Sequence, residues 1–184
     1  MARTMNKILL LVMLFLSTTC TTTATTTTVT FPYIDPELRP YLVQFQKEAT
    51  KRGKVVDVGE IGVLAYAELG TKFAGFCNGN LGVMRKLGMP AGTSLIYIDD
   101  RYKNKKLHNY VFTALVYHEL GHCLLRLDHD DKSYRTIMSE SPIPRKGPEW
   151  DEWNKFYKQN WQLVLTDLFT RPPLASPPKE LRIK

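Results

Sequence analysis

The sequence of 184 residues has little of what characterises the simplest non-globular classes. Its eleven glycines and eleven prolines are too few for a collagen-like or low-complexity chain. Three cysteines cannot supply the dense disulfide framework of a very small exported protein. After residue 17, no apolar run is long enough to cross a bilayer. With 43% apolar and 23% charged residues, the chain is instead predicted to be globular.

The first nineteen residues have the three-part plan of an export signal. Two basic residues, Arg3 and Lys7, precede an apolar run over residues 8–16, and small polar residues follow it. This apolar run is too short to span a membrane. We therefore predict a signal peptide over residues 1–19 and an exported protein, located in the bacterial cell envelope or secreted.

Cys20 is a candidate lipidation site. Residues 17–20 resemble a bacterial lipobox, in which the cysteine is lipidated and becomes the mature N-terminus, although the leucine three residues before the cysteine is missing. We prefer a lipid anchor to the membrane through Cys20. Plain secretion, with cleavage further on, for instance after Ala24, is the alternative. Residues 20–30 are almost pure threonine and are predicted to be a solvated spacer.

The charge of the chain does not point to nucleic acid. The formal net charge of +7 falls to +5 when Arg3 and Lys7 are excluded with the signal peptide. The remaining basic residues are scattered and lack the interleaved aromatic residues of a base-stacking surface. Solvated loops explain them better, and we expect no nucleic-acid partner.

Residues 31–171 are predicted to form one α+β domain, followed by a Pro-rich tail over residues 172–184. The pair Asp35-Pro36 is typical of a helix start, and Arg52-Gly53 of its end. Residues rich in Val, Ile and aromatic side chains predict strands within 54–69, 73–77 and 94–98. An apolar stripe predicts a C-terminal helix that begins near Glu149; it comprises Trp150, Trp153, Tyr157, Trp161, Val164 and Leu168.

The segment 107–127 carries the strongest functional signal. Its apolar residues recur at helical spacing, which predicts a long, buried helix. Within it, His118 and His122 are four residues apart, so both imidazoles lie on one helical face and reach one ion. Glu119 lies beside them, where it could hold a water on that ion. A polar seam in the helix is the alternative, but burying Glu119 there without a metal or a hydrogen-bond partner would be costly.

A hydrolytic zinc site needs a third protein ligand and an open position. His129 is the strongest candidate for that ligand. A straight helix would place His129 about 16 Å along the axis from His118. The chain must therefore turn sharply after about Leu125.

These residues resemble the metzincin zinc endopeptidases, whose motif is H-E-x-x-H-x-x-G-x-x-H followed by a methionine-containing turn. This chain has Leu125 at the glycine position and Asp128 at the position of the third ligand, with His129 next. The segment HELGHCLLRLDHDD followed by TIMS is more similar to a set of exported bacterial metallopeptidases, often lipoproteins, in which the next histidine is displaced by one. That resemblance implies His129 as the ligand. The snapalysin-like metallopeptidases use an aspartate instead, so Asp128 is the alternative.

The resemblance also implies a fold. It comprises a small mixed sheet, an N-terminal helix, a long active-site helix, a methionine turn and a C-terminal helix. Met138 matches the methionine that lies beneath the metal and supports the ligands. Because the motif's glycine is missing, we expect Asp128 to take the left-handed conformation that ends the helix, since Asp tolerates it better than most residues.

Two cysteines remain if Cys20 is lipidated or removed. In an exported protein, Cys77 and Cys123 are predicted to form a disulfide that joins a strand to the active-site helix. Two buried thiols are the alternative.

The predicted function is zinc-dependent hydrolysis of peptide bonds outside the cytoplasm by a monomeric metalloendopeptidase. One catalytic Zn²⁺ would be held by His118, His122 and His129, and Glu119 would act as general base towards a zinc-activated water. The peptide or protein substrate would lie against a sheet edge within residues 72–80. The alternative is a catalytically inactive zinc-binding protein of the envelope, with an interaction role.

Overall fold

The computed structural model describes residues 32–70, 73–78, 92–103, 109–130, 136–140 and 149–173. The predicted signal peptide, the threonine-rich spacer with Cys20, and the tail beyond residue 173 lie outside the described residues. None of the described helices combines the length and the apolar character that crossing a membrane requires.

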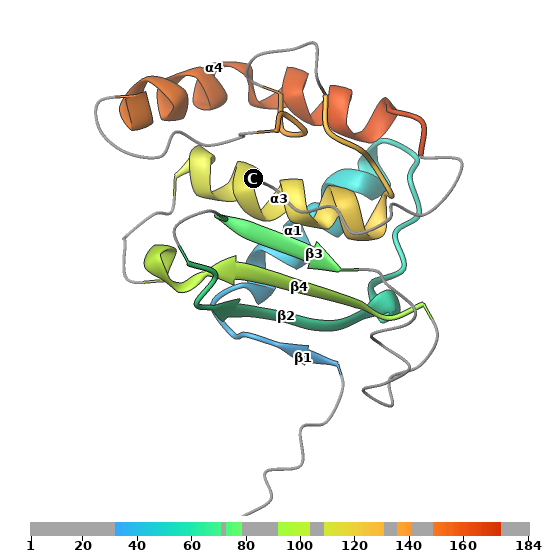
Figure 1. Ribbon diagram of the computed structural model, residues 1–184. Helices are drawn as coiled ribbons and strands as arrows, with labels where there is room; N and C mark the ends of the chain where they lie inside the picture. Colours follow the sequence, from blue (N-terminus) through green and yellow to red (C-terminus); the bar gives the residue numbers. More distant parts are fainter. Residues whose placement is uncertain are drawn as a thin grey trace, which may run out of the picture.

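The described strands form one mixed sheet of four (Figure 1). Their order is β1 (Tyr33–Ile34), β2 (Ile61–Ala67), β4 (Ser94–Asp99) and β3 (Gly75–Asn78). Strands β1, β2 and β4 are parallel, whereas β3 runs antiparallel to β4. Within the described residues, β3 therefore lies at one edge of the sheet.

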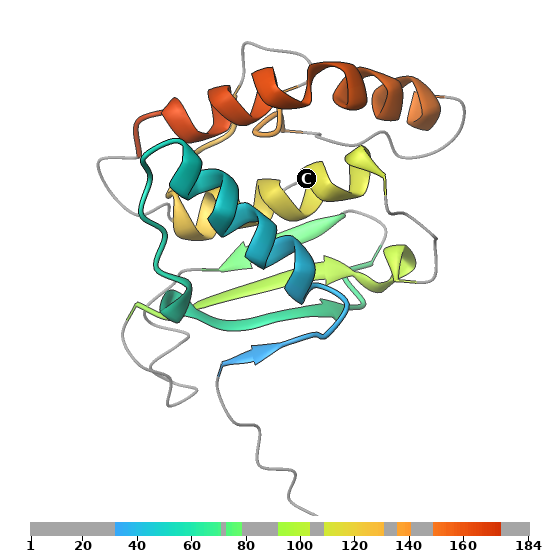
Figure 2. The ribbon, with the colours of Figure 1, turned by 180° about the vertical axis from the view of Figure 1, so that it is seen from behind.

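Three helices are described: α1 (Arg39–Lys51), α3 (Tyr110–Leu124) and α4 (Glu149–Thr170). Helices α1 and α3 lie on the same face of the sheet, and α4 packs on the far side of α3 (Figures 1 and 2). The prediction of an α+β fold with a small mixed sheet, an N-terminal helix, a central helix and a C-terminal helix is confirmed.

Alternation along the strands determines which side chains face the helices. Leu64, Ile96 and Ile98 are fully buried in the main core with α1, α3 and α4. Cys77 is paired with Ile96 and Gly75 with Ile98, so these two residues of β3 lie on the same face. Strand β3 thus presents a glycine and a cysteine to α3.

The starts of α1 and α3 differ from the predicted ones, and local hydrogen bonds explain where these helices begin. Asp35 forms a turn instead of an N-cap, because its Oδ1 accepts a hydrogen bond from the Glu37 N–H at 2.9 Å, and α1 begins only at Arg39. Helix α3 begins at Tyr110, where the Asn109 side chain accepts a hydrogen bond from the Phe112 N–H at 2.9 Å. Helix α4 spans the predicted range, and its buried residues Tyr157, Val164 and Leu168 belong to the predicted stripe.

Candidate metal centre

His118 and His122 are held in one defined orientation. Both are buried on α3, with 0% and 2% of their surface exposed. The Nδ1 of His118 lies 2.7 Å from the carbonyl oxygen of Ile137, and the Nδ1 of His122 lies 2.7 Å from that of Leu127. A carbonyl oxygen only accepts hydrogen bonds, so each Nδ1 carries the hydrogen. Each Nε2 therefore keeps its lone pair, as a metal ligand must.

The three Nε2 atoms converge on one point. His122 Nε2 lies 3.0 Å from His118 Nε2 and 3.1 Å from His129 Nε2, and the ligand atoms of all three residues lie within 4.8 Å of one another. Nitrogen ligands of a tetrahedral zinc ion are separated by about 3.3 Å. Two lone pairs this close repel each other unless a cation lies between them. The three histidines can therefore hold one metal ion.

Burial keeps these imidazoles neutral. Desolvation, with a further contribution from the neighbouring His122, lowers the pKa of His118 well below its usual range. Desolvation also lowers the pKa of His122 to about 4, although the hydrogen bond to Leu127 opposes this shift. Near neutral pH, both side chains are in the unprotonated form that binds metals.

A sharp turn after α3 brings His129 to the other two histidines. The helix ends at Leu124, and the N–H groups of Leu125 and Leu127 both donate to the carbonyl of Gly121. Arg126 has a φ of 55°, in the left-handed region. The expectation that Asp128 takes this conformation is therefore wrong.

The position of Arg126 explains the displaced histidine. In the metzincin motif, the third ligand follows the turn glycine by three residues. Here His129 follows Arg126 by three residues, and both are shifted by one relative to that motif. The extra residue therefore lies before the turn and leaves the path from the turn to the ligand unchanged.

Replacing Arg126 with glycine is expected to stabilise the fold by about 1 kcal/mol. A non-glycine residue in the left-handed region costs about 1–2 kcal/mol, and glycine removes this strain. The greater conformational freedom of glycine in the unfolded chain offsets part of the stabilisation. The lost ion pair with Glu60 is weak, because its atoms are 3.9 Å apart and Arg126 is half exposed. Chemical denaturation measures the change. A destabilised R126G protein would contradict the assigned turn.

Asp128 has another role in the structure. Its Oδ1 accepts a hydrogen bond from the N–H of His129 at 2.8 Å, and its side chain is exposed. Asp128 is not a member of the group of ligand atoms formed by the three histidines. Its carboxylate instead caps the backbone at the residue that carries the third imidazole.

Met138 lies against α3, next to the histidines. It is fully buried, and the carbonyl of the preceding Ile137 is the one that accepts from His118. A Cβ atom added to Gly121 would lie 2.7 Å from the Met138 sulfur, so only glycine allows this close approach. The turn is held by Ser139, whose Oγ donates to the carbonyl of Thr136 at 2.9 Å, and by the Tyr157 hydroxyl, which donates to the same carbonyl at 3.3 Å.

Replacing Gly121 with alanine is expected to destabilise the protein by up to about 2 kcal/mol. The clash with Met138 costs about 1–3 kcal/mol, and the higher helix propensity of alanine offsets about 1 kcal/mol of this cost. Urea unfolding measures the loss. The same substitution in a Met138→Ala background should cost less, because the clashing sulfur is then gone. A G121A protein more stable than the wild type would show that Met138 does not pack here.

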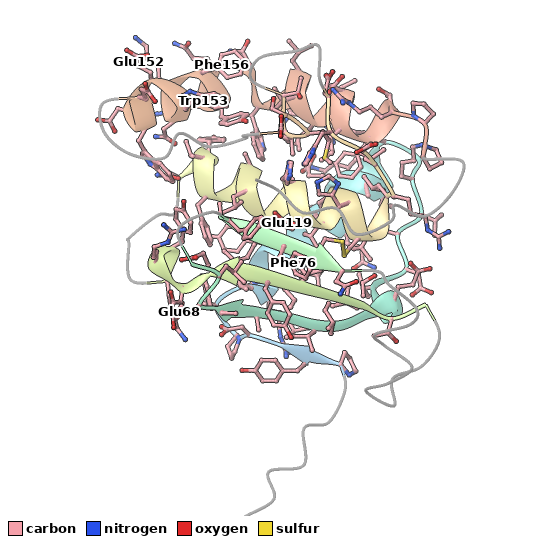
Figure 3. The ribbon with its side chains drawn as sticks, viewed as in Figure 1. Glu68, Phe76, Glu119, Glu152, Trp153 and Phe156 are labelled. Atoms are coloured by element: carbon pink, nitrogen blue, oxygen red, sulfur yellow. A yellow bond between two sulfur atoms is a disulfide. The ribbon has the colours of Figure 1, made fainter. Side chains whose placement is uncertain are left out.

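Glu119 is buried on α3 between His118 and His122 in the sequence. Its exposed fraction is 0%, and within the described residues neither carboxylate oxygen has a hydrogen-bond partner. Desolvation raises the pKa of Glu119 well above its usual range. The side chain lies over β3, where a Cβ added to Gly75 would approach within 2.7 Å of the Glu119 carboxyl carbon (Figure 3).

A disulfide fastens β3 to α3. Cys77 and Cys123 are joined with an S–S distance of 2.02 Å and a Cα–Cα distance of 5.8 Å. Cys123 directly follows His122, so the bond fixes the edge strand close to the histidine cluster. It also keeps Gly75, which is on the same strand as Cys77, close to Glu119 on α3.

Two contributions to this site were not found in the sequence. Gly75 leaves room for Glu119, but no local pattern in the segment around it indicates this contact. Arg171 forms an ion pair with Asp130, the neighbour of His129, at 2.7 Å. Only the folded chain brings these residues together.

Comparison of the chain with protein-family models, with curated proteins and with solved structures gave no match.

Proposed function

We propose that the protein is a zinc-dependent peptidase. The observation that supports this proposal best is the convergence of three imidazole nitrogens beside a buried carboxyl group without a partner. A closed structural zinc site has four protein ligands, whereas a hydrolytic site has three and an open position. The described residues supply three candidate ligands, and Glu119, which directly follows one of them in the sequence, would be the acid–base group.

The residues of the site have separate roles. His118, His122 and His129 would hold the ion through Nε2, and the carbonyls of Ile137 and Leu127 orient two of them. When bound, zinc supplies a Lewis acid and makes water a nucleophile near neutral pH. Glu119 accepts the proton of the attacking water and donates it to the leaving amine.

The substrate would be an extended peptide bound along β3. Within the described residues, β3 is an edge strand that pairs with β4, and an edge strand is where an added peptide forms backbone hydrogen bonds. Glu119 lies over this strand at Gly75, so a peptide bound along β3 would lie next to the proposed base (Figure 3). Backbone pairing of this kind favours peptides over other hydrolysable substrates.

Export of the protein and a lipid anchor through Cys20 belong to the same proposal. The Cys77–Cys123 disulfide supports export, because such bonds persist mainly in oxidising compartments. Residue 20 lies outside the described residues, so the anchor rests on its sequence context alone.

Metal analysis combined with a peptidase assay tests the proposal. The purified full chain is expected to contain one zinc ion per molecule and to cleave unfolded protein substrates. Removing the metal with a chelator should abolish cleavage and lower the melting temperature, because a ligand that binds only the folded state stabilises it. Added zinc should restore both properties. Bound zinc without any cleavage would favour the inactive metal-binding alternative.

A further inference from the structure

The segment that carries His129 is held from the end of α4. Asp130 Oδ2 lies 2.7 Å from Arg171 Nη2, and the same nitrogen lies 2.6 Å from Asp167 Oδ2. Arg171 Nε also donates to Asp167 Oδ2 at 2.9 Å. One guanidinium thus bridges a carboxylate of α4 and a carboxylate adjacent to the third histidine.

This bridge attaches to the segment that carries His129, residues 126–130, most of which has no regular secondary structure. His118 and His122 are positioned by α3, whereas residues 126–129 follow the end of the helix and have no regular secondary structure. The Asp130 N–H donates to the carbonyl of Met138 at 2.7 Å, so its backbone is paired with the methionine turn. Arg171 adds a side-chain attachment at the same residue. The position of His129 depends on both.

The sequence places Arg171 at this point. Pro172 and Pro173 cannot continue a helix, so α4 ends at Thr170 and Arg171 becomes its final anchor. The guanidinium is planar and always charged, with donors arranged to bind two carboxylates at once. Only 19% of its side chain and 18% of that of Asp130 are exposed, so solvent screens the pair only in part.

We propose that Arg171 is a positioning residue for the third metal ligand. By bridging Asp130 and Asp167, it holds His129 in the place where its Nε2 meets those of His118 and His122. The inference rests on the proposed function, in that it takes His129 to be a ligand. It extends the proposed metal site to a residue that binds neither metal nor substrate.

Arg52 offers a matched control. It is an arginine of similar exposure, at 15%, and it is also paired with a carboxylate, that of Glu48, at 2.6 Å. It also reaches α4, through a hydrogen bond to Gln162 at 2.8 Å. Within the described residues, the polar partners of Arg52 lie on α1 and α4 and not in the histidine segment. Replacing either arginine removes an attachment of α4, but only Arg171 should affect the metal.

Cobalt titration of the full chain, followed by visible absorption and by competition with zinc, measures this effect directly. Arg171→Met and Asp130→Asn are each expected to raise the metal Kd by about 10–100-fold, the range for partners that orient ligands. Their combination should cost little more than either alone, because both act on the same bridge: methionine removes its donor, and asparagine removes the negative charge of its acceptor. Arg171→Lys should restore part of the affinity, and Arg52→Met should leave the Kd unchanged while lowering the melting temperature.

The outcomes separate the inference from the proposed function. Wild-type protein that binds neither cobalt nor zinc would overturn both. Wild-type protein that binds metal, together with R171M and D130N proteins that bind it equally well, would overturn only the role of Arg171. If R171M does not fold, D130N decides, because asparagine keeps the size of the side chain and the backbone bond to Met138. An equal loss of affinity in R52M would show a general effect of loosening α4.

Discussion

Replacing Glu119 with glutamine is expected to lower the rate of peptide hydrolysis by about 10²–10⁴-fold, the usual contribution of a general acid–base group. Glutamine has nearly the same shape but does not accept a proton from water. The histidines remain, so the zinc content should not change. Steady-state kinetics with parallel metal analysis measure both quantities. The kcat should fall while the KM stays similar, because Glu119 acts on the reaction and not on the peptide backbone.

Glu48→Gln is the matched control for this substitution. Glu48 is also a buried glutamate, 4% exposed, but it lies on α1 and is paired with Lys51 and Arg52. Its loss should reduce stability and leave the activity of the folded protein unchanged. Full activity in E119Q would eliminate the proposed mechanism. Loss of zinc in E119Q would show instead that Glu119 supports the metal.

Replacing His129 with alanine is expected to weaken zinc binding by a factor on the order of 10³, if the three ligands share a binding free energy of about 10–16 kcal/mol, as measured for structural zinc in zinc-finger peptides. Asp128→Asn should change the affinity by less than about tenfold, because its carboxylate caps the His129 N–H and lies outside the histidine group. Competition with a chromophoric chelator measures both affinities. The two variants therefore distinguish the two candidate ligands.

The stability of the metal-free H129A protein serves as a control for the comparison of H129A with D128N. H129A removes one of three lone pairs that face one another, so the metal-free variant should be at least as stable as the metal-free wild type. A large loss of affinity in D128N with little effect in H129A would reverse the ligand assignment. Equal losses in both would indicate that the turn, and not either side chain, determines binding.

The central part of the site was predictable because it is local. His118, Glu119 and His122 lie within five residues of one helix, and helical periodicity alone brings the two imidazoles onto one face. The need for a turn after about Leu125 followed from the length of a straight helix. The structure confirms a helix that ends just before that point, at Leu124.

The identity of the turn residue was not predictable from preferences. Asp is better tolerated than Arg in the left-handed region, yet Arg126 occupies it. Tertiary contacts explain this choice: Leu127 is buried, and its carbonyl binds His122. These contacts fix the position of Leu127, and their stabilisation offsets the strain of the left-handed conformation at Arg126.

Contacts between distant parts of the chain lay beyond sequence analysis. The bridge from Asp130 to Arg171 joins residues separated by 41 positions, and the packing of Gly75 under Glu119 joins β3 to α3. Neither contact follows a periodic pattern. The first strand, β1, was also missed, because two residues are too few to show alternation.

The residues of α4 that contact the metal centre are synthesised after the three histidines. Translation proceeds from the N-terminus, so all three histidines are made before the residues of α4 and its end that contact the site. Tyr157 donates to the Thr136 carbonyl in the turn with Met138, Leu168 lies near Gly121, and Arg171 is paired with Asp130. A nascent chain thus carries its ligands before it has their supports. Under the proposed function, hydrolysis should therefore require α4, and a fragment that ends before α4 is expected to be inactive.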